Sequence, residues 1–204
     1  YCTQVALLSL VALSLAYEHH KITHEEANHI VKELHELPTI LNHLMKDVQY
    51  VVAGKLISRY SDVFFIGRGL DYALSMEGSL KLKEISYIHS EAYAAGELKH
   101  GTISLIEKGT PVIALATDES LYEKTISNIK EVKARGANVI LICREDFAVS
   151  DDFYDYRISI PKVNLLVQAI ATIVPLQLLA YQIANLRGCE IDQPRNLAKS
   201  VTVE

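Results

Sequence analysis

The first part of the chain, up to about residue 47, has the spacing of apolar residues that helices show. Residues 1–16 are almost entirely apolar, and we expect them to form a buried core helix. A membrane span needs about 20 apolar residues, and the polar residues 17–20 stop this stretch short. A secretory signal peptide would need a basic start and a small-residue cleavage site, which this stretch lacks.

Two further helices are predicted before residue 47. Thr23 and Glu26, three positions apart, form a capping box that starts the second helix, and an apolar stripe follows. Pro38 has no backbone N–H, so we expect this helix to end there. Residues 39–46 then form the third helix.

From about residue 50 the pattern changes to short apolar runs separated by helical stretches. Four runs have the length and composition of buried strands: DVFFIGRG, PVIALATD, NVILICRE and YRISIP. Residues 73–90, 120–134 and 163–187 have helical spacing, and Gly188 closes the last of these stretches. The alternation predicts an α/β fold, a doubly wound parallel sheet with helices on both faces. We expect helix 163–187 to be buried against the first helical segment or another subunit.

Composition and charge narrow the classes of function. Half of the 204 residues are hydrophobic, which suffices for a sizeable core. The net charge of −5 argues against a nucleic-acid partner, and an anionic ligand would need a local cluster of donors. Three widely spaced cysteines without a CxxC motif fit a reducing compartment. Because residue 1 is not Met, we expect the chain to be a fragment of a longer protein.

The segment KLKEISYIHSEAYAAGELKHG, residues 81–101, places many ionisable groups among apolar ones. Glu77, Lys81 and Glu84 are spaced i, i+4 and i+7, so a helix brings them to one face. On spacing alone, a solvated ion-pair stripe explains them, worth about 0.2–0.5 kcal/mol per pair. The alternative is a proton-transfer site. The helix follows a glycine loop at a strand's carboxyl end, so its first turns would border the crevice where such sheets bind ligands.

Other candidate residues also leave two explanations open. His100 is either a turn residue without a role or a general acid or base near neutral pH. Lys199 is either a solvated tail lysine or an amine that forms a Schiff base with a ketose. The glycines of GRG, residues 67–69, lack the third glycine of a dinucleotide site. The two histidines of HEEANH are five positions apart and point in different directions on a helix, so we expect no metal there.

Three blocks of the sequence together resemble one enzyme family. They are GRG after the first strand, EGSLKLKEISYIHSEAYAAGELKHG and the terminal DQPRNLAKSVTVE. They closely resemble the glutamine–fructose-6-phosphate aminotransferases (isomerizing), also called glucosamine-6-phosphate synthases, and the likeness is collinear over the whole chain. In that family a glutaminase domain precedes an isomerase region, which consists of two sugar-isomerase (SIS) domains with doubly wound parallel sheets.

The resemblance implies that this chain is the last part of the isomerase region. Residues 1–49 would be the helical end of the first SIS domain, residues 50–190 the second SIS domain, and residues 191–204 an active-site tail. The family's reaction makes glucosamine 6-phosphate and glutamate from fructose 6-phosphate and glutamine, in hexosamine biosynthesis. It implies a cytoplasmic homodimer, no metal or organic cofactor, and no nucleic-acid or membrane partner.

The resemblance also implies roles for five residues. Glu84 matches the carboxylate that moves a proton between C1 and C2 of the sugar, and Lys81 matches a lysine of the same site. Lys199 matches the tail lysine that reacts with the ketose carbonyl, and Ala198 matches a backbone contact to the sugar. His100 matches a ring-opening histidine that reaches the site from a neighbouring subunit. The last residues of the tail match a segment that closes over the sugar and lines the ammonia path.

The family's phosphate-binding loop and its glutaminase nucleophile lie upstream of residue 1, so we expect the chain alone to be inactive. One alternative is another SIS-domain enzyme that acts on an amino-sugar or fructosamine phosphate, against which the tail DQPRNLAKSVTVE argues. A second alternative is a non-catalytic module that senses sugar phosphates. It would predict a helix-turn-helix with a basic face, and the sequence provides none.

Overall fold

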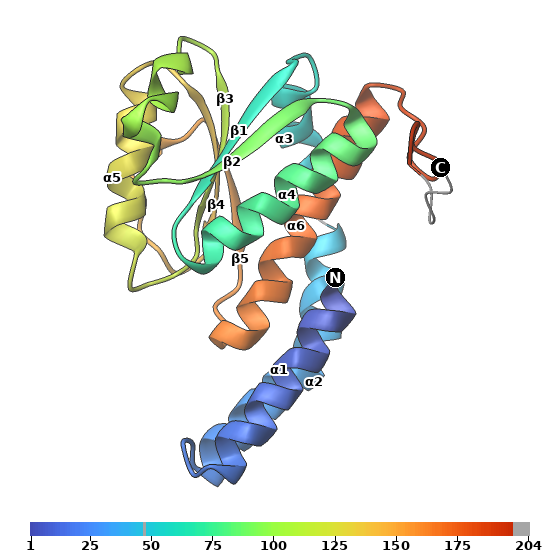
Figure 1. Cartoon of the computed structure of the whole chain (residues 1–204), viewed down its shortest axis with the longest axis vertical. Coiled ribbons are helices and arrows are strands. Elements are labelled where there is room, and N and C mark those ends of the chain that lie inside the picture. The colour runs from blue at the N-terminus through green and yellow to red at the C-terminus, as the bar shows by residue number, and fades with distance from the viewer. Residues whose placement is uncertain (47, 198–204) are drawn as a thin grey trace, which may run out of the picture.

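Five parallel strands form a central sheet in the order β2-β1-β3-β4-β5 in the computed structural model, which describes residues 1–46 and 48–197 (Figure 1). The strands are β1 (Asp62–Gly67), β2 (His89–Ala94), β3 (Pro111–Ala116), β4 (Asn138–Arg144) and β5 (Tyr156–Ile160). After β2, at one edge, the chain crosses β1 and continues on its other side. The predicted α/β fold with a doubly wound parallel sheet is confirmed.

Helices cover both faces of this sheet (Figure 1). The first face is covered by α3 (Gln49–Ile57), α4 (Leu70–Ser86) and α6 (Leu165–Leu186). The second face is covered by α5 (Tyr122–Lys133) and the 3-10 helices η1 (Leu98–His100), η2 (Thr102–Leu105) and η3 (Asp151–Phe153).

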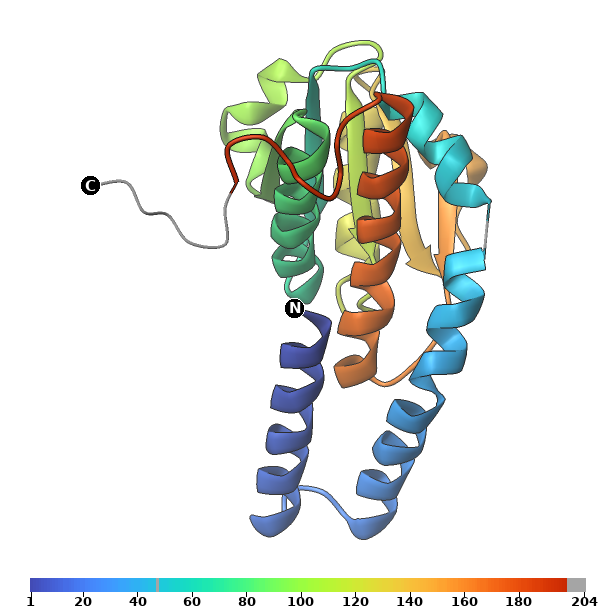
Figure 2. The same cartoon turned by 90° about the vertical axis from the view of Figure 1, so that its right-hand side faces the viewer.

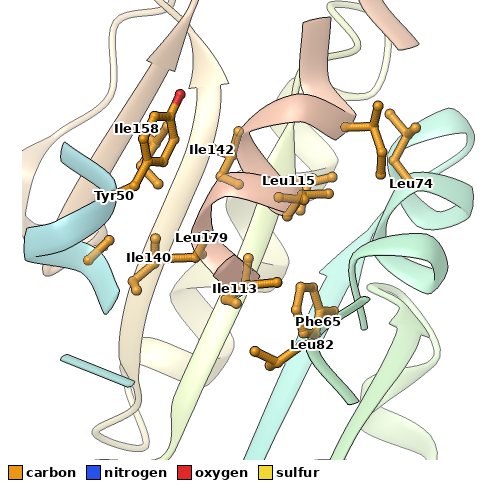
Figure 3. Close-up of a cluster of buried hydrophobic side chains, with 14 of the residues drawn as sticks. Tyr50, Phe65, Leu74, Leu82, Ile113, Leu115, Ile140, Ile142, Ile158 and Leu179 are labelled. Atoms are coloured by element: carbon orange, nitrogen blue, oxygen red, sulfur yellow. The ribbon is translucent and has the colours of Figure 1, made fainter. Parts of the chain in front are cut away.

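The alternation of strand side chains divides the core into two layers. In β1, Phe65 lies in the layer beneath α4 and α6, whereas Phe64 lies in the opposite layer. Figure 3 shows the first layer, in which Leu82 of α4 lies beside Phe65 and Leu179 of α6 lies over the central strands. All six residues of β3 are buried. Because both faces are covered, the central strands β1, β3 and β4 are nearly continuous apolar runs, which is why the sequence predicted them.

The long helix α6 is a core helix. By length and composition it could cross a membrane, but 72% of its most apolar 18-residue stretch is buried inside the protein. It packs against α1 and α2 as well as α3 and α4, so the predicted contact with the first helical segment is confirmed. Gly188, with φ 67°, ends it, and the N–H of Cys189 donates to the carbonyl of Ala184 at 3.0 Å.

The helices α1 (Cys2–Glu18) and α2 (His24–Lys46) form a hairpin that extends beyond the sheet (Figure 2). The prediction that residues 1–16 form a helix is confirmed, but the prediction that this helix is buried is wrong, because only Ser9 and Leu13 of α1 are buried. Its large exposed apolar side chains are Leu7, Leu8, Leu10, Val11, Leu15 and Tyr17. Among the described residues, the outer half of α1 has only α2 beside it, since it lies beyond the end of α6 (Figure 2).

The second helix begins as predicted but does not end at the proline. The N–H of Thr23 donates to Glu26 Oε2 at 2.7 Å and the N–H of Glu26 to Thr23 Oγ1 at 3.2 Å, so the capping box is confirmed. The predicted break at Pro38, and with it a separate third helix, is wrong. Leu37 and Leu44, on either side of the proline, are both buried against other helices, and this packing offsets the missing hydrogen bond.

One strand and one short α-helix, β2 and α3, were not predicted. The helix expected over 73–90 ends at Ser86, and residues His89–Ala94 pair with β1 instead. Tyr87, with φ 59°, turns the chain out of the helix, and β2 at the sheet edge is too polar to form an apolar run. The short helix α3 escaped prediction because it has only nine residues and contains Gly54, a poor helix former.

Asp71, in the first turn of α4, joins the loops that follow β1 and β3. Its carboxylate accepts hydrogen bonds from the N–H of Thr117 at 2.7 Å, the Thr117 hydroxyl at 2.5 Å and the N–H of Asp118 at 3.4 Å. The side chain is buried, and burial raises the pKa of Asp71 against the opposing effect of these donors.

Asp71→Ala should lower the free energy of unfolding by about 2–3 kcal/mol, because two donors of Thr117 lose their acceptor. Asp71→Asn keeps one acceptor oxygen, so it should lower the free energy of unfolding less than Asp71→Ala does. Since the pKa of Asp71 is raised in the folded state, the carboxyl contributes stability below its unfolded pKa and loses it as pH rises through the folded pKa. Lowering the pH should therefore favour the wild type over the Asn variant in denaturant unfolding. A difference that does not change with pH would contradict a buried, titrating carboxyl.

Gly78 of α4 lies where α4 crosses α6. A Cβ at this position would be 2.9 Å from Leu176 Cδ1 and 3.2 Å from Phe65 Cε1, and both of these side chains are buried. Gly78→Ala should therefore lower the free energy of unfolding by about 1–2 kcal/mol, although Ala is the better helix former.

The matched control is Ala73→Gly, at an exposed position of the same helix, where propensity alone should cost about 1 kcal/mol. Thermal or denaturant unfolding measures both variants. If Gly78→Ala stabilised the protein, α4 and α6 would have room for a methyl group and the close approach would be refuted.

Candidate functional site

Glu77, Lys81 and Glu84 lie on one face of α4, as their spacing predicted. Lys81 Nζ is 2.5 Å from Glu84 Oε2 and 3.8 Å from Glu77 Oε1. The side chains are 17–31% exposed, so they are partly sheltered but open to a ligand. Lys83 is not part of this group, since its ammonium donates to the carbonyl of Ser90 at 3.1 Å. This face thus holds one ammonium between two carboxylates.

The position of this face differs from the one expected at the carboxyl edge of the sheet. Helix α4 begins at that edge, but Lys81 follows Leu70 by eleven residues, which is about 17 Å along a helix axis. The contact of Lys83 with Ser90, the second residue of β2, places the end of α4 beside the amino edge of the strands. The first turns of α4 lie at the carboxyl edge, where the crevice was expected. Lys81 and Glu84 lie in its last turns, because a connecting helix runs antiparallel to its strands.

At the carboxyl edge of the sheet, cationic groups are paired within the domain. Arg68 Nε donates to Asn128 Oδ1 at 3.0 Å. Arg144, whose side chain is only 7% exposed, lies 2.5 Å from Asp146 Oδ2 and also contacts the carboxylate of Glu119. These arginines therefore hold the strand ends and loops together through protein acceptors.

The C-terminal segment leaves α6 and crosses the end of α4, where Glu84 lies (Figure 2). Its last described residue is Leu197, so the predicted site residues Ala198 and Lys199 lie outside the described residues. Arg195, four positions before Lys199, contacts Tyr87, the residue after the last turn of α4. Sequence reasoning missed both contact residues, because nothing in their spacing links positions 108 apart.

His100 ends η1 and is exposed, on the opposite side of the sheet from α4. Its neighbour Leu98 is buried in the core layer that faces α5, whereas Leu82 of α4 is buried in the other layer. Within one chain, the sheet thus separates the segment of His100 from the segment of Glu84.

The start of α1 lies near the same face of α4. Cys2 is half-buried, and its pKa is raised, first by burial and further by the charge of Glu77. Tyr1 has its pKa raised by the same two causes in the same order. Cys2 packs against two clusters of buried apolar residues, as a small core residue does.

A separate hollow lies at the amino ends of β1, β2 and β3. It has a volume of about 410 Å³ and is lined by residues 60–64, His89, Glu91, Leu105 and residues 107–111. His89 Nδ1 lies 3.0 Å from Asp62 Oδ1, and both side chains are more than 60% exposed. This pair is a surface contact that aligns the first residues of two neighbouring strands.

The histidines of HEEANH do not form a site with each other. His29 Nδ1 lies 3.7 Å from Glu33, one turn further along α2, and the ring of His24 contacts Tyr17 of α1. Within residues 1–46 and 48–197, no group of three His, Cys, Asp or Glu side chains is arranged to hold a metal ion.

Comparison with known proteins identifies the domain. The SIS domain model matches residues 56–187. The chain is 51% identical to glutamine–fructose-6-phosphate aminotransferase [isomerizing] of Caldanaerobacter subterraneus subsp. tengcongensis and 48% identical to that of Clostridium tetani. Each alignment covers all of this chain and 34% of the relative, so the chain spans about a third of their length.

A solved structure agrees with these matches. The C-terminal domain of glucosamine-fructose-6-phosphate aminotransferase from Francisella tularensis superposes with a TM-score of 0.88 at 33% identity, over 95% of this chain and 55% of that one. Because the matched SIS domain model spans more than half of the residues and the sheet is parallel, the chain belongs to the SIS domain family.

Proposed function

We propose that this chain is the isomerase portion of a glucosamine-6-phosphate synthase, which makes glucosamine 6-phosphate and glutamate from fructose 6-phosphate and glutamine. The observation that carries the proposal is an identity of 51% over the whole chain with an enzyme of that activity. The remaining two-thirds of such an enzyme would supply the glutaminase domain, which releases ammonia from glutamine. We expect the present chain alone to be inactive.

The proposed organisation assigns residues 1–49 to the end of a preceding SIS domain, residues 50–190 to a second SIS domain and residues 191–204 to an active-site tail. The SIS match over residues 56–187 supports the assignment of residues 50–190 to one SIS domain. The exposed apolar residues of α1 support the assignment of residues 1–49 to a preceding domain, because contiguous apolar surface of this kind usually packs against a partner.

In the proposed mechanism, the amine of Lys199 attacks the C2 carbonyl of open-chain fructose 6-phosphate, and water leaves as the Schiff base forms. Ammonia then adds to C2 and the lysine amine leaves. The terminal sequence DQPRNLAKSVTVE supports this role, as does the course of residues 190–197 beside the end of α4. Ala198 would contact the sugar through its backbone.

Glu84 then removes the proton from C1 and returns it at C2, which converts the ketose skeleton to that of an aldose. A carboxylate acts in this way only when it is held in position while remaining accessible. The contact of 2.5 Å with Lys81 Nζ supports the first condition, and the 28% exposure of the Glu84 side chain supports the second. Lys81 is therefore proposed to orient the base.

His100 is proposed to open the sugar ring at the site of a neighbouring subunit in a homodimer. The separation of Leu98 and Leu82 on opposite faces of the sheet supports this arrangement, because it keeps the histidine away from Glu84 of its own chain. The proposal further implies a cytoplasmic enzyme that needs no metal or organic cofactor and has no nucleic-acid or membrane partner.

Glu84→Gln and Lys199→Arg should each reduce isomerisation of fructose 6-phosphate by at least about a hundredfold in the full-length polypeptide, since each removes one chemical step. Product formation and far-ultraviolet circular dichroism measure activity and fold. Glu123→Gln and Lys124→Arg are matched controls on the exposed side of α5 and should retain full activity. Unchanged activity of either site variant would refute the role of that residue.

Inactive His100→Ala subunits mixed with inactive Glu84→Gln subunits should recover about a quarter of wild-type activity, because half of the dimers are mixed and each has one intact site. The mixture is assayed after subunit exchange, with mixed dimers confirmed by mass spectrometry. No recovery in confirmed mixed dimers would show that each site is built from a single chain.

A further inference from the structure

Helix α4 ends on an unusual residue. Tyr87, its C-cap residue, has φ 59° and ψ 19°, the left-handed conformation that glycine adopts most easily at such positions. A bulky side chain there is disfavoured by contact between its Cβ and the backbone. A residue that violates this local rule is often retained for another purpose, and its contacts indicate which one.

The side chain of Tyr87 contacts the C-terminal segment in two ways. The backbone N–H of Arg195 donates to Tyr87 Oη at 2.9 Å. The Arg195 guanidinium lies over the tyrosine ring, 4.1 Å from its centroid, as a cation–π contact. Asn196 follows with φ 62° and the N–H of Leu197 bonds the carbonyl of Pro194 at 3.4 Å, so the chain turns directly after this contact.

The start of the same segment is fixed to the same helix end. Arg187 Nε donates to the carbonyl of Ser86 at 3.1 Å, and Arg187 Nη1 donates to the carbonyl of Ser58 at 2.8 Å. Cys189 Sγ lies 3.7 Å from the carbonyl of Ser86. Residues 187–195 are therefore held at both ends by the last residues of α4.

We infer that Tyr87 and Arg195 are positioning residues that hold the C-terminal tail at the end of α4, so that Lys199 and Glu84 act on the same sugar. Glu84 lies about one helical turn before Tyr87. Lys199 follows Arg195 by four positions in the sequence, and four residues span at most about 14 Å. This inference rests on the proposed function of Lys199 and Glu84.

The test compares graded variants in the full-length polypeptide. Tyr87→Gly removes both contacts and relieves the left-handed backbone, so it should not lower the unfolding temperature. It should reduce kcat by about tenfold, the size expected for losing one hydrogen bond and one exposed cation–π contact. Tyr87→Phe keeps the ring face and Arg195→Ala keeps the backbone donor, so each should reduce kcat less than Tyr87→Gly does. Arg195→Lys keeps a cation, so its kcat should be closer to that of the wild type than the kcat of Arg195→Ala is.

A chemical readout separates positioning from stability. Borohydride reduction traps a Schiff base between Lys199 and fructose 6-phosphate, and the trapping rate should fall with kcat in Tyr87→Gly. The matched control is His20→Gly, which relieves another left-handed residue, φ 52°, in the loop after α1. It should leave kcat and trapping unchanged.

The outcomes distinguish the inference from the proposed function. If Tyr87→Gly and Arg195→Ala kept wild-type kcat and trapping while Lys199→Arg abolished both, the inference would be overturned and the proposed function would stand. Full activity of Lys199→Arg would overturn both. A loss of kcat in Tyr87→Gly that matched a fall in unfolding temperature would also count against positioning, since it would reflect structure alone.

Discussion

The need to bury both faces of a parallel sheet governs this molecule. Strands whose residues are apolar on each side must be covered by helices on each side, and the crossing of α4 and α6 covers one of them. Gly78 permits the close approach of these two helices. Because α4 connects two parallel strands, it runs back from the carboxyl edge to the amino edge. That direction alone decides where the side chains of its last turns are presented.

Much of the fold could be predicted because burial leaves a simple pattern. Strands buried on both faces are continuous apolar runs, and the capping box of Thr23 and Glu26 is a local signal that needs no tertiary contact. The failures depend on contacts between distant segments. Pro38 is tolerated because α2 packs on both sides of it, and the polar edge strand β2 is defined by its pairing with β1. The exposure of α1 depends on which segments lie beside it.

In the candidate site, too, local features could be predicted from the sequence and features that depend on distant segments could not. Helical spacing predicted that Lys81 and Glu84 meet, because residues three apart in a helix are neighbours whatever surrounds them. Their place beside the amino edge depends on the direction of α4. The expectation of a site at the carboxyl edge was wrong because it did not consider how far along α4 these residues lie. The contact between Tyr87 and Arg195 has no sequence signal except a helix end without glycine. Lys199 was singled out only by resemblance, since a lone lysine in a polar tail has no distinguishing pattern.

The order of elements has a consequence for synthesis of the chain on the ribosome. The first face of the sheet is covered by α3, α4 and α6, and α6 is the last of these three helices in chain order. Until residue 186 has left the exit tunnel, the apolar side chains of the sheet on that face lack the cover that α6 provides. During this interval the nascent chain is a substrate for chaperones and prone to aggregation. The speed at which α6 is translated should thus influence the yield of folded protein.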